Sequence, residues 1–322
     1  MRHLGVIGAG AWGTALASHA AMKSAVTLWS READVVDSIN AGEGNPRFLS
    51  GVTLPSAVRA TGALGDLAAC DGLIVAVPVQ HMRAVFARLG TTCPLLLCAK
   101  GIEAQTALLP SEIAIALMPE AHIAVLSGPS FAGEVARGLP TALTLACADA
   151  QISLAWITRL SAAAFRLYAS DDVVGTEIGG AVKNVLAIAA GVVVGRALGE
   201  NARAALIARG FAEMVRYGRA RGGRLETMAG LSGLGDLVLT GGSLASRNMA
   251  LGVALGEGVR VIDALARARG VAEGAATAPV LAADARRRGV AMPVVDAVAD
   301  LLSGADVADV VERLLTRPVG EE

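Results

Sequence analysis

The first half of the chain alternates short apolar runs with stretches in which apolar residues recur at helical spacing. The apolar runs predict six strands, at His3–Ile7, Val26–Trp29, Leu73–Val77, Leu95–Ala99, Ile123–Ser127 and Ala142–Ala146. Between them, stretches such as Trp12–Met22 and Ala33–Ala41 predict amphipathic helices. Strands that alternate with helices favour right-handed crossovers, so we expect a doubly wound parallel sheet of the α/β Rossmann type.

The second half of the chain loses the strand pattern from about Asp171 onward. Asp171 and Asp172 are suitable N-caps for a long apolar helix that runs past Lys183. Pro279 and Pro293 stand where further helices are expected to start, because proline suits the first helical position. We therefore expect an all-α C-terminal domain at 173–322, which follows a sheet domain at 1–172.

A glycine-rich turn follows the first predicted strand directly. Gly8–Gly13 reads GAGAWG, which fits the GxGxxG pattern between a strand and a helix. Gly8 permits the tight turn, Gly10 lets main-chain amides approach a pyrophosphate, and Gly13 lets the helix lie close to the strand. The helix N-terminus then faces the anion. This context predicts that residues 1–172 form a dinucleotide-binding domain.

The end of the second predicted strand is where the ribose of a bound dinucleotide is recognised. Arg31 and Glu32 stand side by side there. An acidic residue would bond the ribose 2′-hydroxyl of NAD, whereas an arginine would hold the 2′-phosphate of NADP. Arg31 slightly favours NADPH among the two cofactors, although both side chains are also typical of an exposed helix start.

Composition excludes several classes of partner. The chain has 322 residues and a net charge of -1, which gives no electrostatic reason to bind nucleic acid or an anionic membrane. The four cysteines show no CxxC pairing, so we expect neither a metal site nor disulfides. Only uncharged residues lie from Asn184 to Gly195, too few for a membrane span, which needs about 20. The N-terminus runs straight into a strand, which favours a cytoplasmic protein.

Lysine is rare in this chain, with three lysines against 25 arginines. Lys183 is the only charged residue between Glu177 and Arg196, and Lys100 follows an apolar run. A partly desolvated ammonium can exchange a proton at biological pH, which a guanidinium cannot. Lys183 is therefore a candidate general acid or base. The alternative is a structural lysine at a helix edge or in an ion pair.

Several motifs together resemble one enzyme family. They are Gly179-Gly180-Ala181-Val182-Lys183-Asn184, Ser127-Gly128-Pro129-Ser130-Phe131-Ala132, Leu234-Gly235-Asp236-Leu237, Ser246-Arg247-Asn248, Asn201-Ala202-Arg203 and Lys100-Gly101-Ile102-Glu103. In order and spacing they resemble the NAD(P)-dependent glycerol-3-phosphate dehydrogenases of the bacterial type, over nearly the whole chain. The resemblance implies reversible reduction of dihydroxyacetone phosphate to sn-glycerol 3-phosphate, a precursor of glycerophospholipids, and it suggests a homodimer.

The same resemblance implies roles for individual residues. Lys183 would be the catalytic acid and base at the substrate C2 oxygen. The implied substrate-binding residues are Lys100, Gly128, Ser130, Asp236, Ser246, Arg247 and Asn248. The implied cofactor-binding residues are Gly8, Gly10, Ala11, Trp12, Gly13, Arg31, Lys100, Ala132, Arg247, Val271 and Glu273. No metal is implied. We expect the active site in the crevice between the two domains.

Some interpretations stay open from the sequence. Ser246-Arg247-Asn248 alone also fits an ordinary helix N-cap, and Asp236, in an expected glycine-rich loop, also fits an Asx-turn. Gly179 and Gly180 fit close ligand approach or simple helix packing. Rival functions are a 3-hydroxyacid dehydrogenase, which needs a carboxylate site, and a non-catalytic nucleotide-binding regulator.

The chain also departs from the family pattern. Ser50 stands where proline is usual, and Gly241-Gly242 replace a Thr-Cys pair. Neither change carries the expected chemistry.

Overall fold

The computed structural model describes residues 1–267 and 272–317, which fall into two compact units. Unit 1 consists of Met1–Lys100 and Leu108–Glu177, and unit 2 consists of Gly101–Ala107 and the chain from Ile178 onward. The sequence places a single boundary at 172/173. The structure instead assigns the first turn of a long helix to unit 1 and a short excursion after Lys100 to unit 2.

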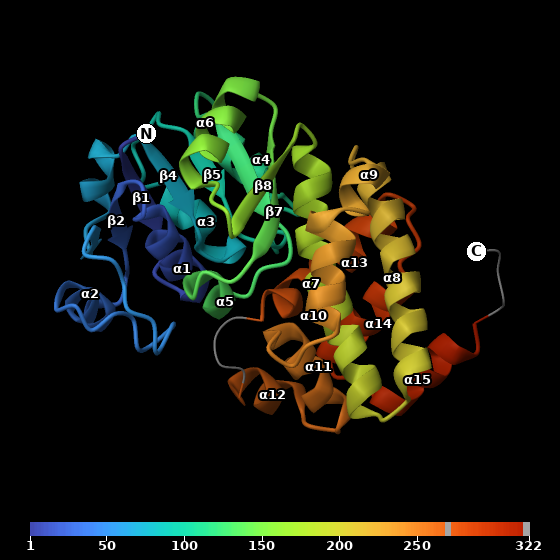
Figure 1. Ribbon diagram of the computed structural model, residues 1–322. Coiled ribbons are helices and arrows are strands. Elements are labelled where there is room, and N and C mark those ends of the chain that lie inside the picture. The colour runs from blue at the N-terminus through green and yellow to red at the C-terminus, as the bar shows by residue number, and fades with distance from the viewer. Residues whose placement is uncertain (268–271, 318–322) are drawn as a thin grey trace. The chain divides into compact units, whose positions relative to one another are not determined.

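Unit 1 contains the sheet and the helices that connect its strands (Figure 1). In chain order its elements are β1 (His3–Ile7), α1 (Ala11–Ala20), β2 (Ala25–Trp29), α2 (Ala33–Asn40), β3 (Val58–Thr61), η1 (Leu64–Ala69), β4 (Gly72–Val75), α3 (Val79–Phe86), β5 (Leu95–Leu97), α4 (Pro110–Leu117), β6 (Ile123–Ser127), α5 (Ala132–Ala136), β7 (Thr141–Cys147), α6 (Ala150–Leu160) and β8 (Phe165–Ser170). The six predicted strands are all present, with ends shifted by a few residues at most.

The eight strands form one sheet in the order β3-β2-β1-β4-β5-β6-β7-β8. The chain runs outward from β1 through β2 to β3 and then returns to the other side of β1 with β4. The neighbours β1 and β4 therefore form the point where the strand order reverses. Open α/β sheets bind ligands at such a point, beyond the carboxyl ends of the strands. The loops after β1 and β4 are consequently the first place to look for a site.

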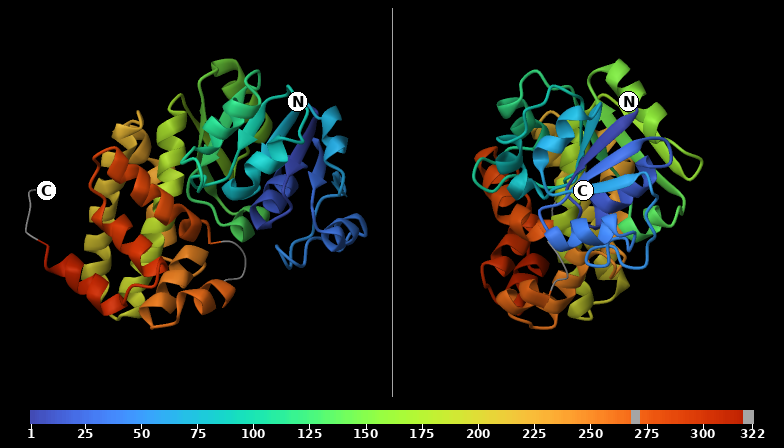
Figure 2. Two further views of the ribbon diagram at one scale, coloured as in Figure 1. Left: turned by 180° about the vertical axis from the view of Figure 1, so that it is seen from behind. Right: turned by 90° about the vertical axis from the view of Figure 1, so that its left-hand side faces the viewer.

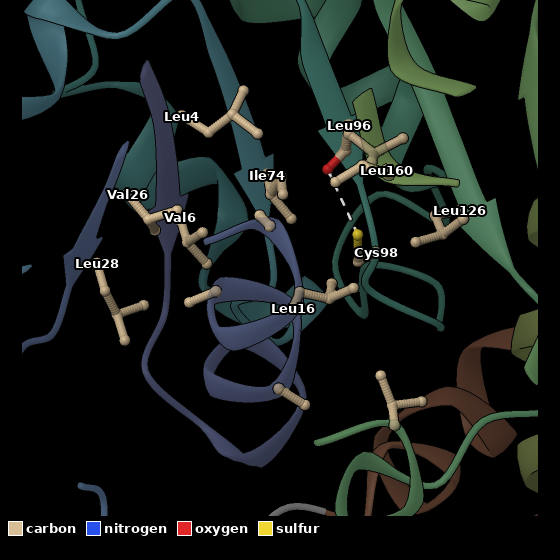
Figure 3. Packing of buried hydrophobic residues seen from close by; sticks show 14 of the residues in the cluster. Leu4, Val6, Leu16, Val26, Leu28, Ile74, Leu96, Cys98, Leu126 and Leu160 are labelled. Atoms are coloured by element: carbon tan, nitrogen blue, oxygen red, sulfur yellow. Dashed lines mark hydrogen bonds between the residues drawn. The ribbon is translucent and has the colours of Figure 1, made fainter. Parts of the chain in front are cut away.

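The sheet is buried on both faces, as a parallel sheet covered by helices requires. Leu4 and Val6 of β1 pack on the face covered by α1, α2 and α6, whereas Ile7 packs on the face covered by η1, α3 and α4. Figure 3 shows the first face, where Leu16 of α1 lies under strand side chains that include Ile74. The helices therefore hold the strand ends rigidly in place.

Two strands and one strand direction differ from the sequence prediction. The strands β3 and β8 were not predicted, because both are edge strands with exposed residues among the buried ones and no continuous apolar run. The sheet is also not wholly parallel, since β7 runs antiparallel to β6. The chain between these two strands carries only the short helix α5, and a parallel crossover usually needs a longer helical connection.

From Ile178 onward the regular structure of unit 2 is helical in the part that the structure describes (yellow-green to red in Figures 1 and 2). After α7 (Val173–Gly195) come α8 (Glu200–Ala220), α9 (Leu225–Met228), the π-helical turn η2 (Leu231–Gly235), α10 (Asp236–Gly241), α11 (Arg247–Gly256), α12 (Val261–Arg267), α13 (Glu273–Arg287), α14 (Pro293–Leu302) and α15 (Val307–Leu315). Of the two predicted caps of α7, Asp171 and Asp172, the second bonds the first turn of the helix: Asp172 Oδ1 accepts a hydrogen bond from the Gly175 amide at 2.8 Å. Pro293 is the first residue of α14, as predicted.

The prediction for Pro279 is wrong. This proline lies inside α13, which already begins at Glu273. Pro279 is exposed to solvent. Because proline has no N–H, one main-chain carbonyl of the helix loses its partner, and water can bond that carbonyl instead.

Helix α7 is long and apolar enough to cross a membrane by length and composition alone. However, 89% of its most apolar 18-residue stretch is buried within the protein. It is therefore the core helix around which unit 2 is built, in agreement with the sequence interpretation.

A buried carboxyl group caps one helix of unit 2. Glu213 of α8 is 1% exposed and accepts hydrogen bonds from the amides of Val294 (2.8 Å) and Val295 (3.2 Å) in the first turn of α14. Burial raises the pKa of Glu213 to about 7, and the two amides only partly oppose this shift. The group thus titrates near neutral pH in the folded protein.

This pKa predicts a specific dependence of stability on pH. Because the folded pKa lies above the unfolded value, folding is favoured below the unfolded pKa and loses up to about 3 kcal/mol as the pH rises through 7. Glu213→Gln removes the titration, so the melting temperature of the wild type should fall relative to the variant between pH 5 and pH 8. Glu226→Gln, an exposed residue of α9, is the control. A constant difference between wild type and Glu213→Gln would contradict the prediction.

Candidate functional site

The glycine turn after β1 has the geometry that the sequence predicts. Gly8 has a φ of 106°, a left-handed conformation that favours glycine. A side chain on Gly13 would place its Cβ 1.9 Å from the Gly8 carbonyl oxygen, so only glycine lets α1 start this close to the strand. Gly8 also packs against Val77, in the segment after β4. The turn therefore lies at the point where the strand order reverses.

A buried asparagine that the sequence analysis did not single out supports this turn. The Asn45 side chain is 1% exposed, and its amide donates to the Ala9 carbonyl and to the Thr14 hydroxyl, each at 2.8 Å. Its Oδ1 accepts from the Phe48 amide at 3.1 Å. The bond to Phe48 lies in the same loop as Ser50, two residues before it. A polar residue in a loop without periodicity carries no signal in a single sequence.

The turn fits a dinucleotide. A Cβ on Gly10 would meet nothing within 4 Å, which leaves room for a group to approach the main chain there. No side chain caps the start of α1, so its first amides, at Ala11 to Gly13, face outward as the anion-binding end of a helix. The indole N–H of Trp12 is buried without a hydrogen-bond partner among the described residues, which leaves it as a further donor.

The candidate substrate residues of unit 1 meet at one carbonyl group. The Lys100 ammonium donates to the Gly128 oxygen at 3.0 Å, and the Ser130 hydroxyl donates to the same oxygen at 3.2 Å. Gly128 has a φ of 142°, which places its carbonyl where both groups reach it. Ala132 then begins α5, which packs against α1. The chain therefore brings these residues close to the helix that carries the glycine turn.

In unit 2, a buried ion pair forms around the candidate catalytic lysine. The Lys183 Nζ lies 3.1 Å from Asp236 Oδ1, with the two side chains 7% and 2% exposed. Because both side chains are buried, the pair fixes the direction in which the Lys183 ammonium points. Asp236 does not lie in a loop as expected, because it is the first residue of α10 and follows the π-helical turn η2.

Close backbone packing brings the two partners together. A Cβ on Gly179, one turn before Lys183, would lie 2.7 Å from the Ser232 carbonyl oxygen and 2.9 Å from the Gly233 Cα. The backbone of η2 therefore lies directly against α7. For Gly179 this contact favours helix packing over close approach of a ligand. Because Asp236 directly follows η2, the same packing positions Asp236 beside α7.

Four glycines pack α7 against α11 in the same way. A Cβ on Gly191 would lie 2.2 Å from the Met249 oxygen, and one on Gly252 would lie 2.0 Å from the Ile188 oxygen. Gly195 and Gly256 repeat this contact one turn further along. Because the two backbones touch, the start of α11 holds a defined position beside α7.

The start of α11 carries the candidate phosphate-binding residues. Ser246 is the N-cap, and its hydroxyl accepts from the Met249 amide at 3.4 Å. The Asn248 amide donates to Asn184 Oδ1 at 2.9 Å, and its oxygen accepts from the Gly274 amide at 3.0 Å. Arg247 is exposed. The structure thus gives Ser246 and Asn248 positioning contacts and leaves Arg247 as the cation at the helix start.

Asn248 also connects two candidate regions. Gly274 follows Glu273, the first residue of α13, so the bond from Gly274 to Asn248 links the start of α13 to the start of α11. Val271, predicted beside the cofactor, lies outside the described residues. Among the described residues no group of three or more His, Cys, Asp or Glu side chains could hold a metal ion.

Comparison with known proteins assigns the family. A family model described as NAD-dependent glycerol-3-phosphate dehydrogenase N-terminus matches residues 3–153, and one described as its C-terminus matches residues 172–312. The glycerol-3-phosphate dehydrogenase (NAD(P)+) of Novosphingobium aromaticivorans is 54% identical, over 99% of this chain and 98% of its own length. That of Zymomonas mobilis is 52% identical, over 99% and 94%.

A solved structure agrees with these matches. The crystal structure of glycerol-3-phosphate dehydrogenase from Coxiella burnetii has a TM-score of 0.94 at 38% identity, and the match covers 98% of this chain and 99% of that one. Both halves of the chain match one family in sequence and in fold. The chain therefore belongs to the NAD-dependent glycerol-3-phosphate dehydrogenase family.

Proposed function

We propose that the protein is an NAD(P)-dependent sn-glycerol-3-phosphate dehydrogenase. It reduces dihydroxyacetone phosphate with NAD(P)H and a proton to sn-glycerol 3-phosphate and NAD(P)+, and it catalyses the reverse reaction. The observation that carries the mechanism is the buried ion pair between Lys183 and Asp236. Family membership favours this reaction over the 3-hydroxyacid dehydrogenase and over a non-catalytic regulator.

Unit 1 supplies the cofactor site in this proposal. Residues Gly8 to Gly13 hold the pyrophosphate through main-chain amides at the start of α1, where the helix dipole favours an anion. When bound, the nicotinamide exchanges a hydride with the substrate C2. The bonds from Lys100 and Ser130 to the Gly128 carbonyl orient these groups toward cofactor and substrate. We propose residues 1–172 as the dinucleotide-binding domain and residues 173–322 as the substrate and catalytic domain.

Lys183 moves the proton. In reduction its ammonium donates a proton to the C2 oxygen as the hydride arrives at C2, and in oxidation the neutral amine accepts that proton. Asp236 stabilises the charged form and directs the ammonium, since its Oδ1 lies 3.1 Å away. General acid and base catalysis of this kind contributes about 10²–10⁴-fold to the rate.

Arg247 binds the substrate phosphate. It stands at the first position of α11, where the helix dipole and a guanidinium both favour an anion. Ser246 and Asn248 fix this helix start through the contacts described above, and each also offers a polar group to the phosphate. The family resemblance adds a contact between Arg247 and the cofactor, together with Glu273 near the nicotinamide.

The direct test is turnover. The protein should oxidise NADPH or NADH in the presence of dihydroxyacetone phosphate, measured as loss of absorbance of the reduced nicotinamide. 3-Hydroxyacids with the oxidised cofactor are the control substrates and should give no reduction. Cofactor binding without turnover of dihydroxyacetone phosphate would contradict the proposal.

Removing the phosphate-binding cation should separate binding from chemistry. Arg247→Ala is expected to raise the KM for dihydroxyacetone phosphate by about 10–100-fold, because a charged hydrogen bond contributes about 1.5–3 kcal/mol. The turnover number should change less, since Lys183 is untouched. Arg219→Ala, which removes an exposed arginine from the last turn of α8, is the matched control and should keep the KM. An unchanged KM for Arg247→Ala would separate this arginine from the phosphate.

We also propose a metabolic role, a cellular location and an oligomeric state. The product, sn-glycerol 3-phosphate, serves as the backbone precursor of glycerophospholipids, and the enzyme acts in the cytoplasm. A strain that lacks the protein should need supplied glycerol 3-phosphate for growth. The family resemblance further suggests a homodimer, which sedimentation of the purified chain would test.

A further inference from the structure

Three side chains form a closed set of hydrogen bonds where β2 ends. Ser30, Arg31 and Glu32 connect β2 to α2, and Glu32 is the N-cap residue of α2. In sheets of this order, the end of the second strand is where the ribose 2′ group of a dinucleotide is recognised. The chain places an anionic side chain, Glu32, and a cationic one, Arg31, there together. Each therefore affects how the other can bind the ribose 2′ group.

Both oxygens of Glu32 are occupied by its neighbours. Oε1 accepts from Arg31 Nη2 at 3.0 Å and from Nε at 3.3 Å. Oε2 accepts from the Ser30 hydroxyl at 3.1 Å, and the Glu32 amide donates back to that hydroxyl at 3.2 Å. Ser30 is 1% exposed and is therefore fixed by the fold.

The exposure of the three residues is graded. The Arg31 side chain is 76% exposed and that of Glu32 is 21% exposed. A guanidinium at the surface can turn away at small cost, whereas the carboxylate is held in place by buried Ser30. Although partial burial alone would raise it, the hydrogen bonds from Arg31 and Ser30 lower the pKa of Glu32 below its usual value. The carboxylate is consequently charged at neutral pH.

We propose that Glu32, held by Ser30, limits the preference for NADP(H) by competing with the cofactor 2′-phosphate for Arg31. This inference rests on the proposed function, because it concerns the cofactor of that reaction. A neutral 2′-hydroxyl leaves the Arg31–Glu32 pair intact and can donate to the carboxylate. A 2′-phosphate must compete with Glu32 for Arg31 Nε and Nη2, the two groups that the carboxylate already binds. The two cofactors are therefore bound with more similar affinity than Arg31 alone would allow.

The test measures binding of nucleotide fragments and does not depend on turnover. The ligands are adenosine 2′,5′-bisphosphate and ADP, titrated by calorimetry into the purified protein. Glu32→Gln keeps the size of the side chain and removes its charge. It should bind the 2′-phosphorylated ligand about fivefold more tightly, the effect of one exposed ion pair, and should bind ADP no more tightly. Arg31→Ala should weaken only the 2′-phosphorylated ligand, and Glu32→Gln in that background should have little effect.

A matched control lies in the same helix turn. Asp34→Asn also removes a carboxylate from the start of α2, but Asp34 is paired with Arg47 at 3.0 Å. Its ratio of affinities should equal that of the wild type. An unchanged ratio in Glu32→Gln, or an equal shift in Asp34→Asn, would overturn the role of Glu32. If the wild type bound neither ligand, the proposed cofactor site itself would fail, which is a separate outcome.

Discussion

Lys183→Arg should reduce turnover by about 10²–10⁴-fold while cofactor affinity stays near that of the wild type. Arginine keeps the positive charge and the pair with Asp236, but a guanidinium stays protonated at any biological pH. The variant therefore removes proton exchange and little else. The measurement is the turnover number with dihydroxyacetone phosphate, together with the dissociation constant of the cofactor.

The chain offers a matched control for this substitution. Lys23, in the turn between α1 and β2, is exposed and donates a hydrogen bond to the Ser161 carbonyl, so Lys23→Arg makes the same chemical change away from the candidate site. It should keep full activity. Because an arginine at position 183 must fit among buried side chains, thermal melting should accompany the assay. A folded Lys183→Arg protein with wild-type turnover would exclude Lys183 from proton transfer.

Lys183→Met tests the same ion pair through stability. Methionine fills a similar volume but removes the ammonium that pairs with the buried Asp236 carboxylate. Breaking a buried pair by removing one partner costs about 3–5 kcal/mol. We expect a clearly lower melting temperature than in Lys183→Arg, in addition to lost turnover.

Gly13→Ala should abolish cofactor binding and also destabilise unit 1. The added Cβ would lie 1.9 Å from the Gly8 carbonyl oxygen and 3.1 Å from its carbon, and both are main-chain atoms. The start of α1 must therefore move away from β1. Forced overpacking of this kind costs about 1–3 kcal/mol, which lowers the melting temperature of a domain of this size by about 2–10 °C. The measurements are thermal melting and calorimetric titration with NADH or NADPH.

Gly10→Ala is the informative partner of this variant. A Cβ on Gly10 meets nothing within 4 Å, and its φ of -66° suits any residue. The melting temperature should therefore stay unchanged, whereas the methyl group would occupy the space that a pyrophosphate needs, and cofactor affinity should fall. Wild-type affinity in Gly10→Ala would place the pyrophosphate elsewhere. A wild-type melting curve in Gly13→Ala would show that the turn relaxes.

Much of unit 1 was predictable because its signals are local. The strand, turn and helix around Gly8–Gly13 follow from apolar runs and glycine positions, and β1 and β6 have the predicted bounds. The strands β3 and β8 were not predicted, because each lies at an edge of the sheet, pairs with only one strand and therefore lacks a continuous apolar run. Their stability comes from pairing with β2 and β7, which lie far away in the sequence.

Some residues of the candidate site could be found from the sequence, whereas the contacts between them could not. Lys183 was found because a lone lysine in an apolar helix is conspicuous in the sequence, and Asp236 because its motif accompanies it. That they form an ion pair could not be derived from spacing, since they come from α7 and α10. Asn45 gave no local signal at all, although it holds the glycine turn through the Ala9 carbonyl.

The sequence by itself determined the α/β class of the first half, the helical second half, the nucleotide-binding turn and the family. These properties depend on hydrophobic periodicity and on short motifs, both of which are local features of the sequence. Only the tertiary structure decided that Gly179 serves backbone packing and that Ser246 and Asn248 hold the start of α11. It also decided that Glu32 forms an ion pair with Arg31. Each of these depends on which atoms meet after folding, and such contacts are set by packing and hydrogen-bond geometry that no single segment contains.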